Sequence, residues 1–207
     1  MAWTETRVHK DPWDVEQRLR ELTLGRAGLL VIRDVALNEA ANATPNHCAN
    51  AAGTFSYQHG TWALRDQFVG RGWTVDRTDG VEAIFNKQLN IRVAFQNVDR
   101  ACDDESPPAP RSEKGAGAER LCEGNGLFGQ LPRFAPVPFD RCATFYLMTA
   151  ADGACELSRP VIANGAFTAY VERIYLSDGS DFAEKKRLPL DSDDAVTDFD
   201  PQVVRRA

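Results

Sequence analysis

The sequence predicts a single α+β domain in which N-terminal helices pack on a mixed or antiparallel β-sheet. Two observations support this fold class. The first third of the chain shows helical periodicity, and two groups of strand-like runs follow at residues 73–98 and 143–176. A length of 207 residues is enough to bury one main core without disulfides or a structural metal.

The composition is that of an ordinary globular protein, with 43% hydrophobic and 26% charged residues. A formal net charge of −6 argues against a general nucleic-acid coat protein, because phosphate binding requires a basic field. The five cysteines are odd in number and widely spaced, and no signal peptide precedes them. We therefore expect reduced thiols and a cytoplasmic protein, and the absence of a long apolar run predicts no membrane partner.

The N-terminal region predicts an arm followed by a helix. Residues 1–10 have no periodicity and are expected to form a flexible or docking arm. Asp11 is a suitable N-cap, Pro12 suits the first helical position, and Gly25 is the expected stop. Apolar residues fall on one face of this helix, namely Val15, Leu19 and Leu22.

A second apolar segment, residues 28–41, fits another helix, although its first half also fits a strand. The small and polar residues from Asn42 to Gly60 predict a long loop. Thr61 then caps a short helix that ends before Gly70.

The first group of strands has the spacing of a meander, with runs at residues 73–76, 81–86 and 90–98. The third run alternates, so that Ile91, Val93 and Phe95 share one face while Arg92, Ala94 and Gln96 share the other. One face of this strand should therefore be fully buried, and the other should be a thinner, partly polar surface.

The second group predicts a three-stranded antiparallel meander, because Asp152-Gly153 and Asn164-Gly165 separate its runs. Its charged residues are expected to form cross-strand ion pairs on the solvent face: Glu156, Arg159, Glu172 and Arg173.

Irregular segments separate and follow the two groups of strands. The segment 103–118 is rich in proline, glycine and charge, and a short helix is expected at residues 116–122. Residues 124–140 interleave proline with phenylalanine and suggest an extended segment. The predicted organisation is thus an arm at 1–10, a domain at 11–180, and an acidic, partly disordered tail at 181–207.

The run RSEKGAGAER, residues 111–120, is the first candidate site. Cationic side chains beside glycines could present charge and free backbone N–H groups to a phosphate or a partner. The candidate binding residues are Arg111, Lys114, Gly115, Gly117 and Arg120. The run matches no standard phosphate loop, and a solvated linker is the alternative interpretation.

The element order resembles the restriction-endonuclease-like core, in which a helix, three strands, a second helix and further strands follow one another. That resemblance implies Mg²⁺ held by carboxylates on the second and third strands. The candidate catalytic residues are Asp79, Glu82, Gln96 and Asp99. The third strand offers Ala94-Phe95-Gln96 and no carboxylate, so the motif is broken and a catalytically degenerate relative is favoured over an active nuclease.

No cysteine or histidine spacing predicts a metal site, and we expect the cysteines to be structural. A nucleophile could still be assembled from distant residues such as Cys102 and His59.

The runs IRVAFQNVDRAC and RSEKGAGAER resemble segments of uncharacterised proteins encoded by phages and prophages of Gram-negative bacteria. This resemblance extends over most of the chain after Trp62, and it implies a context but no activity. We therefore expect a phage-type accessory protein without chemistry or a cofactor of its own. Such a protein would bind a host protein or a protein–nucleic-acid complex, for example as an inhibitor of host defence. The alternative is a nucleic-acid enzyme or a degenerate nuclease-like protein that binds the phosphate backbone.

Overall fold

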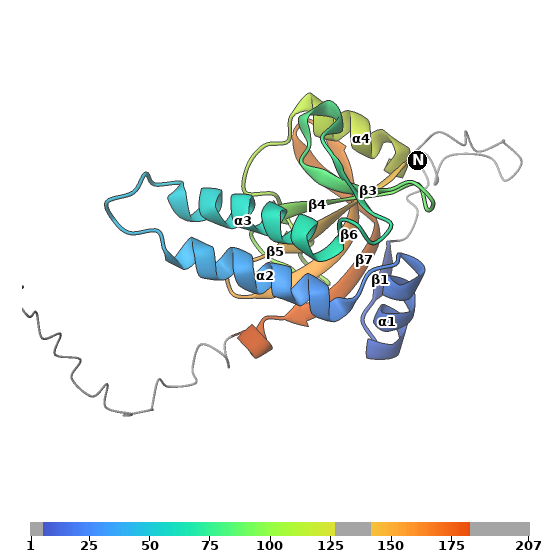
Figure 1. Ribbon diagram of the computed structural model, residues 1–207, viewed down its shortest axis with the longest axis horizontal. Coiled ribbons are helices and arrows are strands. Elements are labelled where there is room, and N and C mark those ends of the chain that lie inside the picture. The colour runs from blue at the N-terminus through green and yellow to red at the C-terminus, as the bar shows by residue number, and fades with distance from the viewer. Residues whose placement is uncertain (1–5, 127–141, 183–207) are drawn as a thin grey trace, which may run out of the picture.

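The computed structural model describes residues 6–126 and 142–182, and it has the expected α+β fold (Figure 1). Its helices are α1 (Pro12–Glu21), α2 (Arg26–Ala41), α3 (Ala51–Phe68) and α4 (Ala116–Gly126), with a 3-10 turn at Thr78–Gly80. Its strands are β1 (Arg7–His9), β2 (Thr74–Asp76), β3 (Ala83–Asn86), β4 (Ile91–Asn97), β5 (Ala143–Thr149), β6 (Ala154–Ala163) and β7 (Ala166–Asp178).

The strands form one mixed sheet in the order β1-β7-β6-β5-β4-β3-β2. Both predicted meanders are present, because β2, β3 and β4 pair antiparallel and so do β5, β6 and β7. The two meanders join through β4 and β5, which run parallel and are connected by a crossover that contains α4. The order expected from the sequence, a helix, three strands, a second helix and further strands, is thus present as α3, β2 to β4, α4 and β5 to β7.

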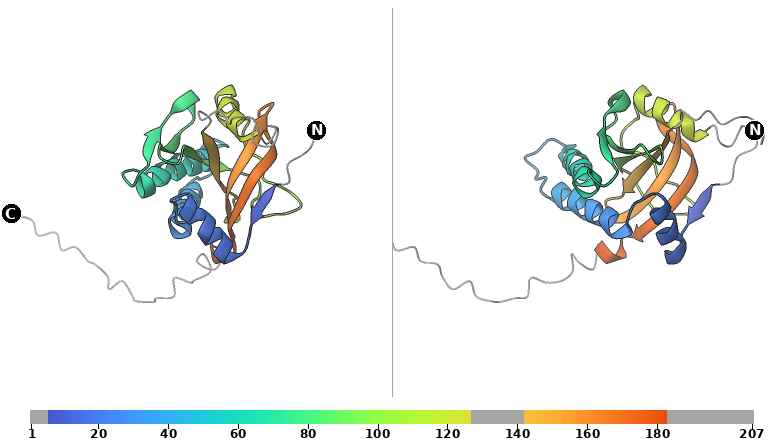
Figure 2. Two further views of the ribbon diagram at one scale, coloured as in Figure 1. Left: turned by 90° about the vertical axis from the view of Figure 1, so that its right-hand side faces the viewer. Right: turned by 45° about the vertical axis from the view of Figure 1, so that its right-hand side comes forward.

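The sheet separates two hydrophobic clusters. The larger one lies under α1, α2 and α3, and on β4 it takes Ile91, Val93 and Phe95. The smaller one lies on the opposite face, under α4, and takes Ala94 from the same strand. The predicted division of β4 into an apolar face and a partly polar face is confirmed, but the partly polar face is also buried: Arg92, Ala94 and Gln96 are 8%, 1% and 5% exposed. Figure 2 shows α2 and α3 side by side against the sheet.

The N-terminal segment is attached to the sheet. Arg7–His9, within the stretch expected to be an arm, form β1 and pair parallel with Glu172–Ile174 of β7. The side chain of His9 is buried, with Nδ1 2.7 Å from an Asp14 carboxylate oxygen and Nε2 3.1 Å from one of Glu172. This polar contact, rather than an apolar pattern, anchors the segment, which explains why periodicity did not reveal it.

The start of the third helix was predicted wrongly. We expected a loop up to Gly60 and a helix from Thr61, whereas α3 begins at Ala51. The misassigned stretch contains two glycines, Gly53 and Gly60, and several residues of low helix propensity, among them Thr54, Ser56 and His59. Tertiary contacts stabilise this half of the helix: the Asn97 side chain donates to the Gly53 carbonyl oxygen and accepts a 2.7 Å hydrogen bond from Ser56.

The charged residues of the second meander also differ from expectation. Glu156 has no exposed surface and Arg173 is 3% exposed, so this pair lies in the interior and not on the solvent face. The Arg173 guanidinium donates to both Glu156 carboxylate oxygens, at 2.9 and 2.7 Å. The segment 101–110, which follows β4, covers them: the Cys102 amide donates to Glu156, and Arg173 donates to the Asp103 carbonyl oxygen.

Two predicted features lie outside the described residues. They are most of the proline- and phenylalanine-rich segment, at 127–141, and nearly all of the acidic tail, at 183–207.

Candidate functional site

A polar cleft of about 730 Å³ lies beside the end of β4. Its walls are the N-terminal half of α3, the turn at residues 79–82, the last residues of β4 and the segment 111–118. Tyr146 of β5 also lines it. We call this space the polar cleft.

The cleft exists because β3 is shorter than β4. The pairing of the two strands ends where Ala83 faces Ala94, so Phe95 to Asn97 have no strand neighbour on that side. Small side chains on this face of the sheet, at Ala94 and Ala118, leave space above the strand. The segment after β4 folds back over this space, since the Arg111 amide donates to the Asn97 carbonyl oxygen and the Lys114 amide to that of Gly165.

The polar cleft brings together most of the residues singled out in the sequence. Its lining includes Asp79, Glu82, Gln96, Arg111, Lys114, Gly115 and Gly117. Arg120 lies next to it and contacts Asp79. Asp99 does not line the cleft; its carboxylate accepts hydrogen bonds from the amides of Arg100 and Ala109 and stabilises its own loop.

Two of the three carboxylates that line the cleft, Asp79 and Glu82, are engaged by arginines. Asp79 accepts hydrogen bonds of 2.9 and 2.6 Å from Arg120. Glu82 accepts from Arg65 and lies 3.3 Å from Arg77. The hydrogen bond from Arg65 lowers the pKa of Glu82 below its usual value. These ion pairs neutralise Asp79 and Glu82 without using either cation of the 111–114 segment.

Lys114 enters the cleft without an opposite charge. Its ammonium donates to the Gln96 side-chain oxygen and lies 5.4 and 5.7 Å from the ring centroids of Tyr146 and Phe167. No described carboxylate lies within ion-pair distance of it. Burial lowers the pKa of Lys114 to about 8, because desolvation disfavours its charged form.

Tyr146 was not foreseen as a site residue. It is 2% exposed, and its hydroxyl lies beside the Cys122 thiol without an oxygen or nitrogen partner among the described residues. Burial and the neighbouring Cys122 raise the pKa of this hydroxyl, so it keeps its proton. In the sequence Tyr146 is one aromatic residue in an apolar strand, and nothing in that pattern distinguishes it from a core residue.

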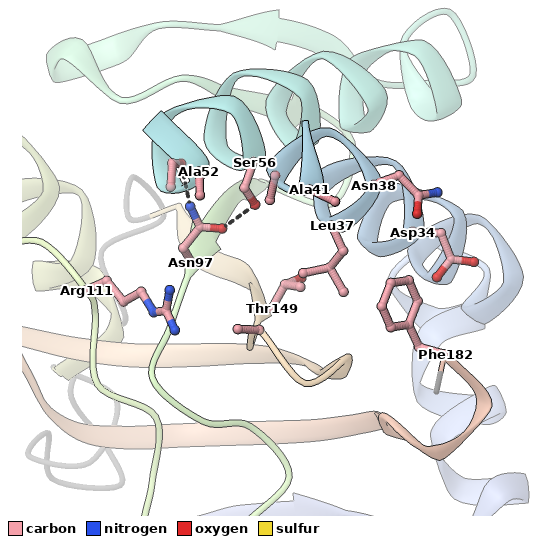
Figure 3. Close-up of a pocket in the computed structure, with 13 residues that line it drawn as sticks. Asp34, Leu37, Asn38, Ala41, Ala52, Ser56, Asn97, Arg111, Thr149 and Phe182 are labelled. Carbon is pink, nitrogen blue, oxygen red and sulfur yellow. Dashed lines mark hydrogen bonds between the residues drawn. The ribbon is translucent and has the colours of Figure 1, made fainter. Parts of the chain in front are cut away.

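A second, smaller cleft of about 540 Å³ adjoins the first and lies between α2, α3 and the end of β5 (Figure 3). The two spaces share Ala52, Gly53, Asn97 and Arg111. Figure 3 shows the Arg111 guanidinium in this second space, on the side opposite Asp34. Arg111 therefore lies at the junction of the two clefts, and its side chain is exposed and forms no ion pair within the described part of the chain.

The other residue types considered for chemistry are dispersed. Among residues 6–126 and 142–182, no three His, Cys, Asp or Glu side chains are grouped closely enough to hold a metal ion. The Cys102 thiol contacts the carbonyl oxygens of Cys155 and Ser177, and burial raises its pKa to about 12. His59 lies 3.8 Å from Glu39, so these two candidate residues have different neighbours.

No described helix is both long enough and apolar enough to span a bilayer. Comparison of the chain with protein-family models, with curated proteins and with solved structures returned no match.

Proposed function

We propose that this protein acts by binding a phosphate-bearing ligand, the backbone of a nucleic acid, in the polar cleft, and that it has no chemistry of its own. The observation that carries this proposal is the state of the charges in the cleft. Arg111 and Lys114 have no described ion-pair partner, whereas Asp79 and Glu82 are already paired with arginines. Glu113, the third carboxylate that lines the cleft, is exposed and forms no described ion pair. The free charges are therefore two cations and one carboxylate, so the field offered to a ligand is cationic although the whole chain is acidic.

A phage-type accessory role remains a proposal, and it agrees with a binding cleft of this kind. A protein that binds to a host protein–nucleic-acid complex, or to the nucleic acid within it, would block the action of that complex by binding alone. The acidic balance of the chain would limit non-specific attachment to nucleic acid, because long-range repulsion opposes every contact outside the cationic cleft.

Arg111→Ala tests the proposal. We expect it to weaken the binding of a 20-nucleotide oligonucleotide of any sequence and to reduce the slope of log affinity against log salt by about 1, since one phosphate contact is lost. Fluorescence anisotropy between about 50 and 200 mM salt would measure both quantities. Arg20→Ala is the matched control, because Arg20 is an exposed arginine on α1 that does not line the cleft. Equal affinity and slope for the two variants would refute the proposal.

A nucleic-acid enzyme is the second candidate, and the presence of Asp79, Glu82 and Gln96 in one cleft favours it. Under this alternative Mg²⁺ would be the cofactor, and cleavage would be lost on Asp79→Ala. Under the proposed function we expect no cleavage of single- or double-stranded DNA or RNA with Mg²⁺ or Mn²⁺. Gel analysis of end-labelled substrates would check this, and cleavage that Asp79→Ala abolishes would replace the binding proposal with the enzymatic one.

A further inference from the structure

Lys114 differs from the buried charged side chains, because each of those contacts an opposite charge. Those side chains are Arg33, Arg92, Glu156, Glu172 and Arg173. Lys114 instead faces two aromatic rings and one amide oxygen. A largely desolvated ammonium without a counter-charge is unfavourable unless a ligand supplies one.

Next to Lys114, the cleft holds a second unused donor. An ammonium has three N–H donors, and Lys114 uses one of them on Gln96. The Tyr146 hydroxyl lies beside the Cys122 thiol, a weak acceptor, and has no oxygen or nitrogen acceptor among the described residues. Both side chains line the same cleft, so three N–H or O–H donors converge there without an oxygen or nitrogen acceptor.

We infer that Lys114 and Tyr146 form the floor of a subsite for a terminal phosphate group of the bound nucleic acid. This inference rests on the proposed function of the polar cleft and names the part of the ligand that reaches deepest. The donors match the three terminal oxygens of a phosphate monoester, which carries nearly two negative charges at neutral pH.

A phosphate in the interior of a strand fits this floor less well. The sheet closes the cleft behind Ala94 and Tyr146, which are directly paired residues of β4 and β5. An internal phosphodiester has a nucleoside on both sides, whereas a terminal phosphate has one free end that can enter such a recess. Arg111 lies at the exposed mouth of the cleft, where it can contact the next phosphates along the same strand.

The start of α4 adds to the preference for an anion. This helix of 11 residues begins at Ala116, and Gly115, Gly117 and Ala118 line the cleft. The N-terminal end of a helix carries a partial positive charge and free backbone N–H groups. A Cβ on Gly117 would lie 2.0 Å from the Asp79 carbonyl oxygen, so glycine is required for α4 to pack this closely against the turn.

Binding requires a small rearrangement of Lys114. The Tyr146 hydroxyl is covered in the ligand-free protein, and the Lys114 ammonium lies near the face of the same ring. The lysine side chain has four rotatable bonds, so it can turn toward an entering phosphate and uncover the hydroxyl.

Two oligonucleotides that differ only at one end test the inference. We expect the full-length protein to bind a 5′- or 3′-phosphorylated 12-mer at least tenfold more tightly than the same 12-mer with hydroxyl ends. Tyr146→Phe should remove most of this difference, since it deletes one donor to a charged group. Inorganic phosphate should compete only with the phosphorylated strand.

The stability of Tyr146→Phe separates a ligand contact from a structural role. Removing a buried hydroxyl without a partner should leave the unfolding temperature unchanged or raise it. A lower unfolding temperature would show that the hydroxyl has a structural partner, and it would overturn the inference.

Raising the pH adds a second test. The titratable groups around Lys114 are Tyr146 in the cleft, the buried Cys122 of α4 and three carboxylates at the rim, from Asp79, Glu82 and Glu113. The pKa of Lys114 is about 8, so its charge is lost as the pH rises above that value. Affinity for the phosphorylated 12-mer should fall roughly tenfold between pH 7 and 9.5, and Lys114→Met should abolish this dependence.

The outcomes distinguish this inference from the proposed function. Equal affinity for phosphorylated and hydroxyl-ended strands, both weakened by Arg111→Ala, would overturn the terminal-phosphate subsite and keep the binding cleft. Failure to bind either strand would overturn both.

Discussion

Replacing Arg173 with methionine is expected to lower the free energy of unfolding by about 3–5 kcal/mol, because it leaves a buried carboxylate without its counter-charge. Glu156 is completely buried and accepts two hydrogen bonds from this guanidinium. Its remaining donors are the Cys102 amide and the Ser158 hydroxyl, which cannot neutralise the charge. Urea denaturation at constant m-value would measure the loss.

The double variant Glu156→Gln/Arg173→Met is the control for this prediction. It removes the charge together with the guanidinium, so it should be more stable than Arg173→Met alone. A double variant that is less stable than the single one would mean that lost packing, and not an unpaired charge, is the cause.

Gly60→Ala should destabilise the protein by about 1–3 kcal/mol, although alanine favours helices, because the added methyl group overpacks the core. A Cβ at this position would lie 2.6 Å from ring carbons of Phe95, which is 1% exposed and belongs to the larger core cluster. The close approach of α3 to β4 therefore depends on this glycine. Thermal or urea denaturation would measure the effect.

Gly53→Ala provides a matched control in the same helix. A Cβ on Gly53 meets no atom within 4 Å, so this variant should be unchanged or more stable by up to about 1 kcal/mol. Phe95→Leu combined with Gly60→Ala should recover part of the loss by making room for the methyl group. Equal effects of the two glycine substitutions would contradict the proposed contact between helix and sheet.

Local signals in the sequence were sufficient for much of the fold. The turn at Asn164-Gly165 needs a positive φ at both residues, and they adopt φ values of 53° and 74°. Such a turn joins strands that are adjacent in the chain, so its residues predict the pairing directly. The alternation at Ile91, Val93 and Phe95 similarly identified the face that α3 covers.

Features that depend on distant parts of the chain could not be predicted in this way. The first half of α3 has weak helix preference, and contacts from Asn97, 41 residues after Ser56, help to hold it. Glu156 and Arg173 appeared to belong on a solvent face because the sequence does not show that the segment after β4 covers them. The same limit applies to the candidate site. The sequence identified the site residues that lie close together in one loop. It could not identify Tyr146, which reaches the cleft because β5 pairs with the distant strand β4.

The short edges of the sheet also have a consequence for behaviour in concentrated solution. The outermost strands, β1 and β2, have three residues each, so either edge gives another chain little backbone to pair with. Beyond β1, side chains occupy carbonyl oxygens of the longer β7: Thr6 donates to Tyr170, and Arg26 donates to Leu176. Deleting residues 1–10 would remove both β1 and the Thr6 contact, and the shortened protein should aggregate through β7 at concentrations where the intact chain remains dispersed.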